Sequence, residues 1–527
     1  MNNAVFVAAG ILLSRVAGLV RLRAFAHYFG LQSDAADAFN AAFRIPNVLQ
    51  NLFGEGALSA SFIPVYAALV SRGERREADR VAGAVGALLA LVVAALVLSG
   101  LLATPLLIAA IAPGFAGEKR ALTIAIVRVL FPGAGLLVLS AWCLGVLNSH
   151  GRFLLSYAAP VMWNAAMIAT LVALGAETPL PRLAVLLAWG SVAGSALQLA
   201  VQLPTVARVA PDARPTLNLA SAHVRAVVRN FVPVLLSRGV VQVSSYIDSL
   251  LASLLPTGAV TGLANAQLLY TLPISLFGMS VAAAELPAMA GAGALDLAGT
   301  QAVRARLEAG LRRIAFFVVP SAVAFLALGD IVAAALLQTG RFRHADAVFV
   351  WSILAGSALG LVPSTLGRLY SSTYYALGDT RRPLAYAAVH VVLATILGYV
   401  FAILLPPRLG IPTIWGTAGL TVAAAIAAWV EMLLLRRALD SRIGRTGLGR
   451  GYAIRLWTAA AAAAAVAWAV KAVSPALHPA IVALVVLIPY GAVFLSCTAA
   501  LRLAEASDAL RFILRKARLA SHEIRSD

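Results

Sequence analysis

The chain has 527 residues, of which 61% are hydrophobic and only 12% are charged. A soluble domain usually carries about 25% charged residues because its surface must be polar, so the composition excludes an ordinary water-soluble protein. The formal net charge is +19 with only three lysines, and the arginines lie in short loops between apolar runs. This placement indicates membrane topology and contact with anionic lipid, and argues against nucleic acid as a partner.

About fourteen apolar segments of about 18 to 30 residues follow along the chain, and each could cross about 30 Å of hydrocarbon as a helix. Their centres lie near Ala17, Ala57, Val97, Leu137, Ala166, Gly194, Val241, Ser275, Phe325, Leu361, Leu393, Ala424, Val466 and Leu487. The alternating ten-residue segments of a membrane β-barrel are missing from this pattern. The sequence therefore predicts an all-α integral membrane protein.

Every second loop is rich in arginine, as in the stretch from Arg72 to Arg80 and the stretch from Arg436 to Arg450, whereas the loops at 175–181 and 474–479 are nearly uncharged. The positive-inside rule then places both termini in the cytoplasm. The basic C-terminal tail is expected to be an amphipathic helix on the inner leaflet or a solvated tail.

Three pairs of similar segments recur at an offset of about 224 to 229 residues, which is room for about six spans. The pairs are Arg152-Phe-Leu-Leu-Ser-Tyr-Ala-Ala159 with Arg381-Arg-Pro-Leu-Ala-Tyr-Ala-Ala388, Pro113-Gly-Phe115 with Thr339-Gly-Arg-Phe342, and Leu52-Phe-Gly54 with Leu276-Phe-Gly278. An even number of spans preserves orientation, so the halves are expected to be parallel repeats. The predicted domains are an N-terminal six-helix lobe (1–220), a C-terminal six-helix lobe (221–445), two additional transmembrane helices (446–505) and a basic cytoplasmic tail (506–527).

The first apolar segment carries Arg15 and Arg21, and a charge inside a span requires a physical reason. Gly10 and Gly18 interrupt this segment and predict a bent or broken helix, and a break near Gly18 would let both arginines point into one cavity between the halves. Such a cavity would bind an anion. The alternative is that the arginines snorkel to the membrane interface.

The second segment contains Asp37, which is expected to pair with an arginine of the first segment when the site is empty. Arg44 follows at the start of a helix that Pro46 is expected to distort. The span opening the second half carries Arg238 and Asp248, and Asp248 is expected either to pair with an arginine or to bind a small cation. The sequence shows no metal-ligand spacing, nucleotide motif or catalytic constellation, so the chain is not expected to be an enzyme.

The N-terminal motifs resemble those of the MurJ/MviN family of lipid II flippases, which belongs to the multidrug/oligosaccharidyl-lipid/polysaccharide exporter superfamily. They are Ser14-Arg15-Val-Ala-Gly18-Leu-Val-Arg21, Ala36-Asp37-Ala-Phe39, Phe43-Arg-Ile-Pro46-Asn47 and Leu52-Phe-Gly-Glu55-Gly56-Ala-Leu-Ser59. Later motifs agree, namely Asn265-Ala-Gln267, Thr339-Gly-Arg-Phe342 and Tyr374-Tyr-Ala-Leu-Gly-Asp-Thr-Arg381.

This resemblance implies two six-helix lobes around a basic central cavity, with a groove for the polyprenyl tail at the last two helices. Carried over by position, the cavity residues are Arg15, Arg21 and Asp37, with Glu55 in the acidic position of its motif. It also implies a cation site in the second lobe, at Asp248 and Asp379. The chain departs from the family at Gln50, Asn51 and Leu268, where basic residues are common, and Arg238 is a hypothetical replacement for one of those charges.

The predicted function is therefore that of a lipid II flippase in the bacterial cytoplasmic membrane. It would move undecaprenyl-pyrophosphate-linked peptidoglycan precursor from the inner to the outer leaflet by alternating access. The predicted substrate-binding residues are Arg15, Arg21, Asp37, Arg44, Glu55 and Arg238. No cofactor is expected, and Na⁺ or H⁺ is the expected coupling ion; membrane lipids and cell-wall synthesis proteins are the other expected partners. The alternatives are an exporter of another polyprenyl-linked saccharide or of drugs, a membrane-embedded enzyme acting on lipid carriers, and a scaffold that transports nothing.

Overall fold

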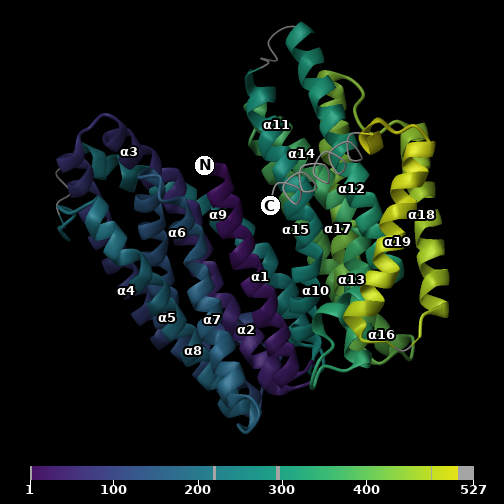
Figure 1. Cartoon of the computed structure of the whole chain (residues 1–527), viewed down its shortest axis with the longest axis horizontal. Helices are drawn as coiled ribbons and strands as arrows, with labels where there is room; N and C mark the ends of the chain where they lie inside the picture. The colour runs from purple at the N-terminus through teal and green to yellow at the C-terminus, as the bar shows by residue number, and fades with distance from the viewer. Residues whose placement is uncertain (1–2, 218–220, 292–296, 476, 508–527) are drawn as a thin grey trace, which may run out of the picture. The chain divides into compact units, whose positions relative to one another are not determined.

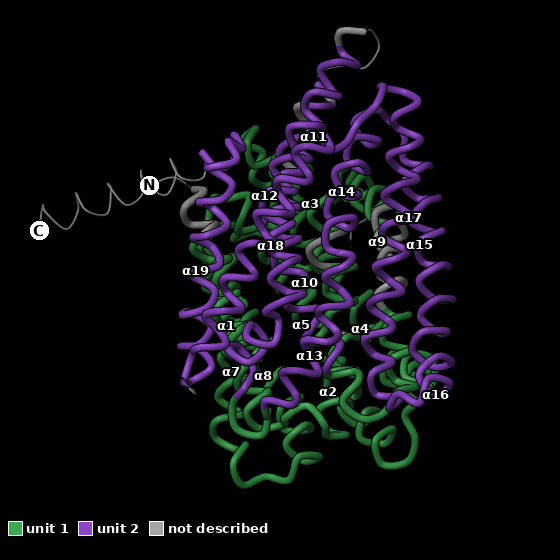
Figure 2. The backbone as a smooth tube through the Cα atoms, turned by 90° about the vertical axis from the view of Figure 1, so that its right-hand side faces the viewer, with its two compact units in different colours: residues 1–261, 339–343 green, residues 262–338, 344–527 purple. Residues whose placement is uncertain are grey.

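The computed structural model describes residues 3–217, 221–291, 297–475 and 477–507, which form helices joined by short loops (Figure 1). Within these residues the only β-type pairing is an isolated bridge between Thr339 and Phe342. The predicted all-α fold is confirmed. The chain divides into two compact units (Figure 2): residues 1–261 with 339–343, called unit 1, and residues 262–338 with 344–527, called unit 2.

Unit 1 is a helical bundle held by two hydrophobic clusters, one around Phe62 and Tyr66 and the other around Phe39 and Phe131. Its helices are α1 (Asn3–Phe29), α2 (Asp34–Leu49), η1 (Gln50–Leu58), α3 (Ser59–Ser71), α4 (Arg75–Ile111), α5 (Gly117–Ser149), α6 (Phe153–Ala158), α7 (Pro160–Leu174), α8 (Leu180–Val209) and α9 (Ala222–Ser253). The first residues of α10 (Ala259–Pro273) also belong to unit 1.

Unit 2 continues from α10 and is likewise helical. Its further elements are η2 (Ile274–Met279), α11 (Ser280–Gly291), α12 (Leu297–Leu337), α13 (His344–Leu359), α14 (Leu361–Ala376), α15 (Arg381–Tyr399), η3 (Val400–Leu404), α16 (Leu405–Arg408), η4 (Thr413–Trp415), α17 (Gly416–Ile443), α18 (Arg450–Val473) and α19 (Pro479–Ala500). The predicted tail, 506–527, lies outside the described residues from residue 508 onward.

Small residues and paired polar side chains hold the helices together. The backbone of Gly194 in α8 approaches Trp163 of α7 so closely that an added Cβ would lie 2.8 Å from the Trp163 carbonyl oxygen. Between α5 and α8, Ser140 donates to Gln202 at 2.7 Å and accepts from Gln198 at 2.8 Å. Close approach and satisfied polar groups are what association of helices in lipid requires, because apolar burial gives no driving force there.

Ten helices among the described residues are long and apolar enough to cross a membrane, or eleven if the bent pair α13 and α14 counts as one span. Three further helical stretches carry charge: α1, the run from α2 through α3, and α9. Counting these as crossings is consistent with the predicted number of about fourteen.

The two Leu-Phe-Gly sequences of the predicted repeat both lie in π-helical turns, Leu52-Phe-Gly54 in η1 and Leu276-Phe-Gly278 in η2. Each π-helical turn continues directly from an α-helix, α2 or α10. Turns of this kind are rare, occur mostly as bulges within α-helices and are frequent at functional sites. The two compact units are defined by contacts within the structure, whereas the predicted lobes are defined by a repeat in the sequence. The lobes at 1–220 and 221–445 therefore stay predictions.

Two helices, α18 and α19, occupy the range where two additional spans were predicted, and both attach to α12. The Tyr490 hydroxyl of α19 donates to the Pro320 carbonyl at 2.7 Å. The Lys471 ammonium of α18 lies 2.6 Å from the Asp330 carboxylate. Each contact supplies a polar partner to a group that would otherwise be costly to bury.

Candidate functional site

Arg21 of α1 lies against two aromatic side chains inside unit 1. Its guanidinium carbon is 5.0 Å from the ring centre of Phe43 and 5.0 Å from that of Trp163, and these two rings stack on each other at 5.4 Å. Its Nη1 approaches the sulfur of Met167 at 3.5 Å. Among the described residues no carboxylate neutralises this guanidinium. Cation–π contacts hold the charge in place while leaving it able to bind an anion.

Arg15 lies six residues earlier on the same helix, and its side chain is exposed. The predicted break at Gly18 is wrong, because α1 continues as one α-helix from Asn3 to Phe29. Residues six apart on a straight helix do not share a face. Arg15 and Arg21 therefore project in different directions, and their predicted convergence on one cavity through a broken helix has no support in α1.

The carboxylate of Asp37 is buried, with 1% of the side chain exposed, and accepts four polar contacts. Its Oδ1 accepts from the backbone N–H of Thr261 at 2.9 Å and from the Thr261 hydroxyl at 2.7 Å. Its Oδ2 accepts from the backbone N–H of Gly258 at 2.9 Å and from the Lys119 ammonium at 2.8 Å. Asp37 thus satisfies free N–H groups at the start of α10, as a capping residue does.

Lys119, at the start of α5, is the partner that sequence reasoning missed. Its ammonium lies 2.8 Å from Asp37, 3.1 Å from Asp34 and 3.4 Å from the Thr257 hydroxyl. The Thr257 hydroxyl donates in turn to Asp34 at 2.7 Å. The predicted pairing of Asp37 with an arginine of α1 is wrong in this conformation. A role of Asp37 in substrate binding stays a prediction.

One signal in the sequence could have pointed to Lys119. The chain has 41 basic residues, yet lysine occurs at only three positions. A lysine has three donors on one rotatable ammonium, whereas arginine presents a flat fork. A site with three acceptors in different directions favours the lysine. Below, Asp34, Asp37, Lys119, Thr257, Gly258 and Thr261 are called the Asp37 cluster.

Arg44 of α2 and Asp248 of α9 interact electrostatically within unit 1. Both side chains are half-buried, and Tyr246 is a second group whose charge acts on Arg44. Pairing with an arginine is one of the two roles that the sequence predicted for Asp248. The other, cation binding, stays a prediction.

The side chains of Glu55 and Arg238 lie outside the described residues, although their backbones lie in η1 and α9. Gln50 and Asn51, which replace common basic residues of the family, form the first turn of η1. Leu268 is half-buried in α10. The predicted roles of Glu55 and Arg238 in substrate binding stay predictions.

Asp379 has a local structural role at the start of α15. Its Oδ1 accepts from the backbone N–H groups of Arg381 at 3.1 Å and Arg382 at 3.2 Å. Its Oδ2 lies 3.0 Å from the Arg442 guanidinium. The hydrogen bond from the Arg382 N–H and the nearby guanidinium groups lower the pKa of Asp379. A carboxylate engaged in this way is a helix cap, and no cluster of three or more metal-ligating side chains occurs in the described part of the chain.

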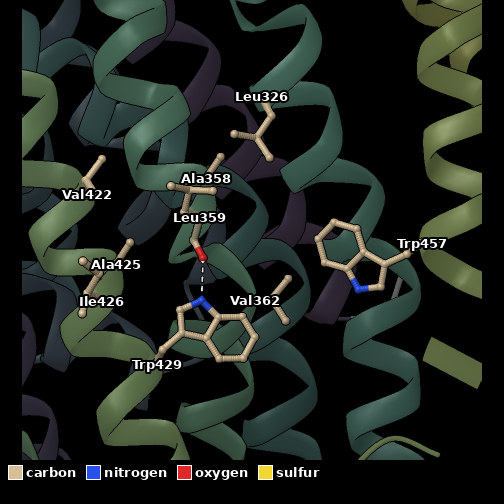
Figure 3. Close-up of a pocket in the computed structure, with 9 residues that line it drawn as sticks. All are labelled: Leu326, Ala358, Leu359, Val362, Val422, Ala425, Ile426, Trp429 and Trp457. Carbon is tan, nitrogen blue, oxygen red and sulfur yellow. Dashed lines mark hydrogen bonds between the residues drawn. The ribbon is translucent and has the colours of Figure 1, made fainter. Parts of the chain in front are cut away.

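Unit 2 contains an apolar cavity of about 300 Å³ (Figure 3). Trp429 of α17 borders it and donates from its indole N–H to the Leu359 carbonyl at 3.0 Å. Trp457 of α18 also borders the cavity. The remaining lining residues are Leu326, Ala358, Val362, Val422, Ala425 and Ile426. A cavity of this chemistry suits a hydrocarbon chain and offers almost no polar partner.

The apolar helices of the described residues, arranged in two compact units, define a polytopic helical membrane protein. A family model for lipid II flippase MurJ matches residues 25–490. The lipid II flippase MurJ of Burkholderia cenocepacia is 32% identical over 439 residues, an alignment that covers 82% of each chain. A probable lipid II flippase MurJ of Rhizobium meliloti is 31% identical over 452 residues, covering 81% of this chain and 78% of its own. The chain belongs to the MurJ family, which confirms the resemblance seen in its motifs.

Solved structures agree at the level of the fold. A lipid II flippase MurJ in an inward closed conformation superposes with a TM-score of 0.76, at 21% identity, and covers 95% of this chain and 100% of its own. An inward-facing multidrug resistance MATE family transporter of the MOP superfamily gives a TM-score of 0.64 at 16% identity, covering 84% of this chain and 99% of its own.

Proposed function

We propose that this protein is a lipid II flippase of the bacterial cytoplasmic membrane. It moves the undecaprenyl-pyrophosphate-linked peptidoglycan precursor from the inner to the outer leaflet. The observation that carries this proposal is the 32% identity with the Burkholderia cenocepacia flippase, which extends over 82% of both chains. Similarity over that length includes helices of both units, so it is not limited to one shared motif.

The setting of Arg21 supports a pyrophosphate cargo. A pyrophosphate carries about two negative charges, and arginine binds phosphate oxygens bidentately while staying charged. The guanidinium of Arg21 is positioned by Phe43 and Trp163, with no described carboxylate to compete for it. In this mechanism Arg21 is the first anion-binding residue. Arg15 on another face of α1, Arg44 beside Asp248, and Arg238 are proposed to contact the substrate at other steps of the cycle.

The apolar cavity of unit 2 supports a lipid cargo. A polyprenyl chain stays in a hydrocarbon environment throughout transport, because moving it through water would cost about 0.8 kcal/mol for each CH₂ group. Trp429 and Trp457 border a space that accepts such a chain without polar groups. We place the tail of the substrate there while the head group changes sides by alternating access.

Energy for the cycle is proposed to come from an ion gradient or from the membrane potential. The potential is worth about 2.3 kcal/mol per charge per 100 mV, which is enough to bias the orientation of a cationic empty site. Na⁺ or H⁺ is the proposed coupling ion. Both termini are proposed to lie in the cytoplasm, and cell-wall synthesis proteins are proposed partners at the membrane.

The likeness to MATE transporters extends to the fold alone at 16% identity, so it does not favour drugs as the cargo. The decisive experiment is depletion of the protein in its native host, with lipid II measured separately in the two leaflets. We expect lipid II to accumulate in the inner leaflet, and the wild-type gene to restore its distribution. An unchanged distribution after depletion, in a cell without a second flippase, would contradict the proposal.

A further inference from the structure

A histidine and a glutamate meet between two spans of unit 2. The Nδ1 atom of His390 in α15 lies 2.9 Å from the Oε2 atom of Glu431 in α17. The His390 side chain is 23% exposed and that of Glu431 is 25% exposed. The distance is that of an ion pair, although the ring is not aligned for an ideal hydrogen bond to this oxygen. Neither residue belongs to the anion site or to the apolar cavity described above.

The pair lies inside the apolar part of both helices. His390 is eight residues beyond Arg382, and Glu431 is five residues before Arg436. At about 1.5 Å per residue, the pair lies about 7 to 12 Å deeper than these arginines, which mark one end of the helices. An unpaired carboxylate at this depth would be costly, so the imidazole is its required partner.

Charge balance determines which ligand this pair takes. With no shared proton the pair carries one negative charge, and with one proton it is neutral as a whole. An apolar surrounding favours a neutral pair over a charged one, so one proton is the ligand that suits this pair. Sodium is a poor alternative, since hard cations take several oxygen ligands and an imidazole nitrogen is not one of them.

Few other ionisable groups face the pair among the described side chains. Tyr375 on α14 lies close enough to Glu431 to interact with its charge. Tyr386 on α15 lies about one helical turn before His390. The charged groups on α12 and α17 that surround Tyr370, namely Glu308, Arg436 and Asp440, lie closer to the end of the helices. Among the described residues, His390 is the basic side chain within salt-bridge distance of Glu431.

We infer that His390 and Glu431 form a proton-binding site of unit 2, which takes up one proton per transport cycle. The proton resides on the imidazole nitrogen or on the carboxylate oxygen and returns to water on release, so no further reactant is needed. The coupling of this proton to lipid movement rests on the proposed flippase function, whereas the binding of the proton is independent of that function.

Proton binding is tested directly on the purified full-length protein by infrared difference spectroscopy during a pH titration. We expect one coupled carboxyl and imidazole change in the wild type, lost in Glu431→Gln and in His390→Gln. The exchanged variant, His390→Glu with Glu431→His, keeps the pair and should regain the change. The matched control is Glu177→Gln, an exposed loop carboxylate, which should leave the change intact. A wild-type spectrum identical to that of Glu431→Gln would overturn the site.

Coupling is tested in proteoliposomes with fluorescent lipid II, under a pH difference at zero membrane potential. A difference of one pH unit is a tenfold ratio of proton activity, so we expect wild-type transport to change by up to about tenfold. Glu431→Gln should lose this response. Transport by the wild type without any response to the pH difference would refute the coupling alone. Absence of lipid II transport by the wild type would refute the flippase function, while the spectroscopic result would still decide the proton site.

Discussion

The ammonium of Lys119 lies 2.8 Å from the carboxylate of Asp37, and only 1% of the Asp37 side chain is exposed. The two residues belong to α5 and α2, 82 positions apart. The same carboxylate accepts N–H groups at the start of α10. One buried charge pair thus ties three helices together at one end of unit 1.

Breaking this pair is expected to be strongly destabilising. Lys119→Gln leaves the Asp37 carboxylate buried without its counter-charge, and losing one partner of a buried pair costs about 3 to 5 kcal/mol. Asp37→Asn should cost less, because an amide oxygen still accepts from the N–H groups of Gly258 and Thr261. Thermal unfolding of the purified protein in detergent measures both.

The neighbouring Glu118 provides the control, since its side chain is exposed and Glu118→Gln should leave the unfolding temperature unchanged. The double variant Asp37→Asn with Lys119→Gln should lose less unfolding free energy than the sum of the losses in the two single variants, because neither charge is then left without its partner. Strict additivity would show that the two groups do not interact in the membrane protein.

The sequence predicted the class and the family, but not the partner of Asp37. Apolar segment lengths and arginine-rich loops are local properties, so they can be read directly from the chain. The pairing with Lys119 depends on how α5 packs beside α2, which no local pattern encodes. The capping of α10 by Asp37 is likewise a contact between distant segments.

The prediction for α1 failed for a different reason. Gly18 does not break the helix, because a glycine costs only about 1 kcal/mol inside a helix relative to alanine, and α1 continues through it. Pro46 was expected to distort the second segment, and the irregular turns lie just beyond it, in η1. A glycine alone is thus a weaker signal of irregular backbone than a proline followed by a glycine-rich motif.

Arg21→Gln is expected to reduce lipid II transport by at least tenfold while leaving the unfolding temperature within a few degrees. The substitution removes the charge that binds pyrophosphate, and a charge-assisted phosphate contact is worth about 1.5 to 3 kcal/mol. Phe43→Leu should weaken transport less, because the guanidinium remains but loses one of its two aromatic contacts. The measurement is flipping of fluorescent lipid II in proteoliposomes.

Arg72→Gln is the matched control for Arg21, since Arg72 is an exposed arginine in a loop. It should transport at the wild-type rate. Equal transport by Arg21→Gln and Arg72→Gln would remove Arg21 from the proposed mechanism.

Filling the apolar cavity of unit 2 should discriminate between cargo tails. Val422 lines the cavity and is half-buried, so Val422→Trp places a larger side chain in the space of about 300 Å³. We expect slower transport of lipid II with its full polyprenyl chain and little change for an analogue with a short chain. Ile488→Trp, on the exposed side of α19, should affect neither. An equal loss for both tail lengths would argue that the cavity does not hold the tail.

Acid is expected to weaken unit 2 through Asp379. Hydrogen bonding by the Arg382 N–H lowers the pKa of this carboxyl below its ordinary value. Its contribution to stability is therefore complete above the unfolded pKa of about 3.9, and it is lost as the pH falls through the lower folded value. Between about pH 6 and about pH 3, the melting temperature should fall less steeply for Asp379→Asn than for the wild type. Parallel curves of melting temperature against pH would contradict the role of Asp379 as a cap.

Gly340 is expected to be indispensable at the corner between α12 and α13. It has a positive φ of +53°, and an added Cβ would lie 2.4 Å from the His27 carbonyl oxygen. That carbonyl accepts the backbone N–H of Arg341 at 2.9 Å, and the His27 ring contacts the Thr339 hydroxyl at 2.8 Å. Gly340→Ala therefore adds a steric clash to the cost of a left-handed residue, and we expect it to destabilise the protein by about 3 kcal/mol.

Gly151 separates these two effects. Its φ is +72°, but nothing lies within 4 Å of an added Cβ. Gly151→Ala should therefore cost only about 1 kcal/mol, the conformational penalty of the left-handed region. Thermal unfolding of the two variants side by side measures the difference, which reports the contact between the corner at Gly340 and the end of α1. If both variants lose the same stability, the close approach of Gly340 to His27 makes no contribution, and the Thr339-Gly-Arg-Phe342 motif is explained by backbone conformation alone.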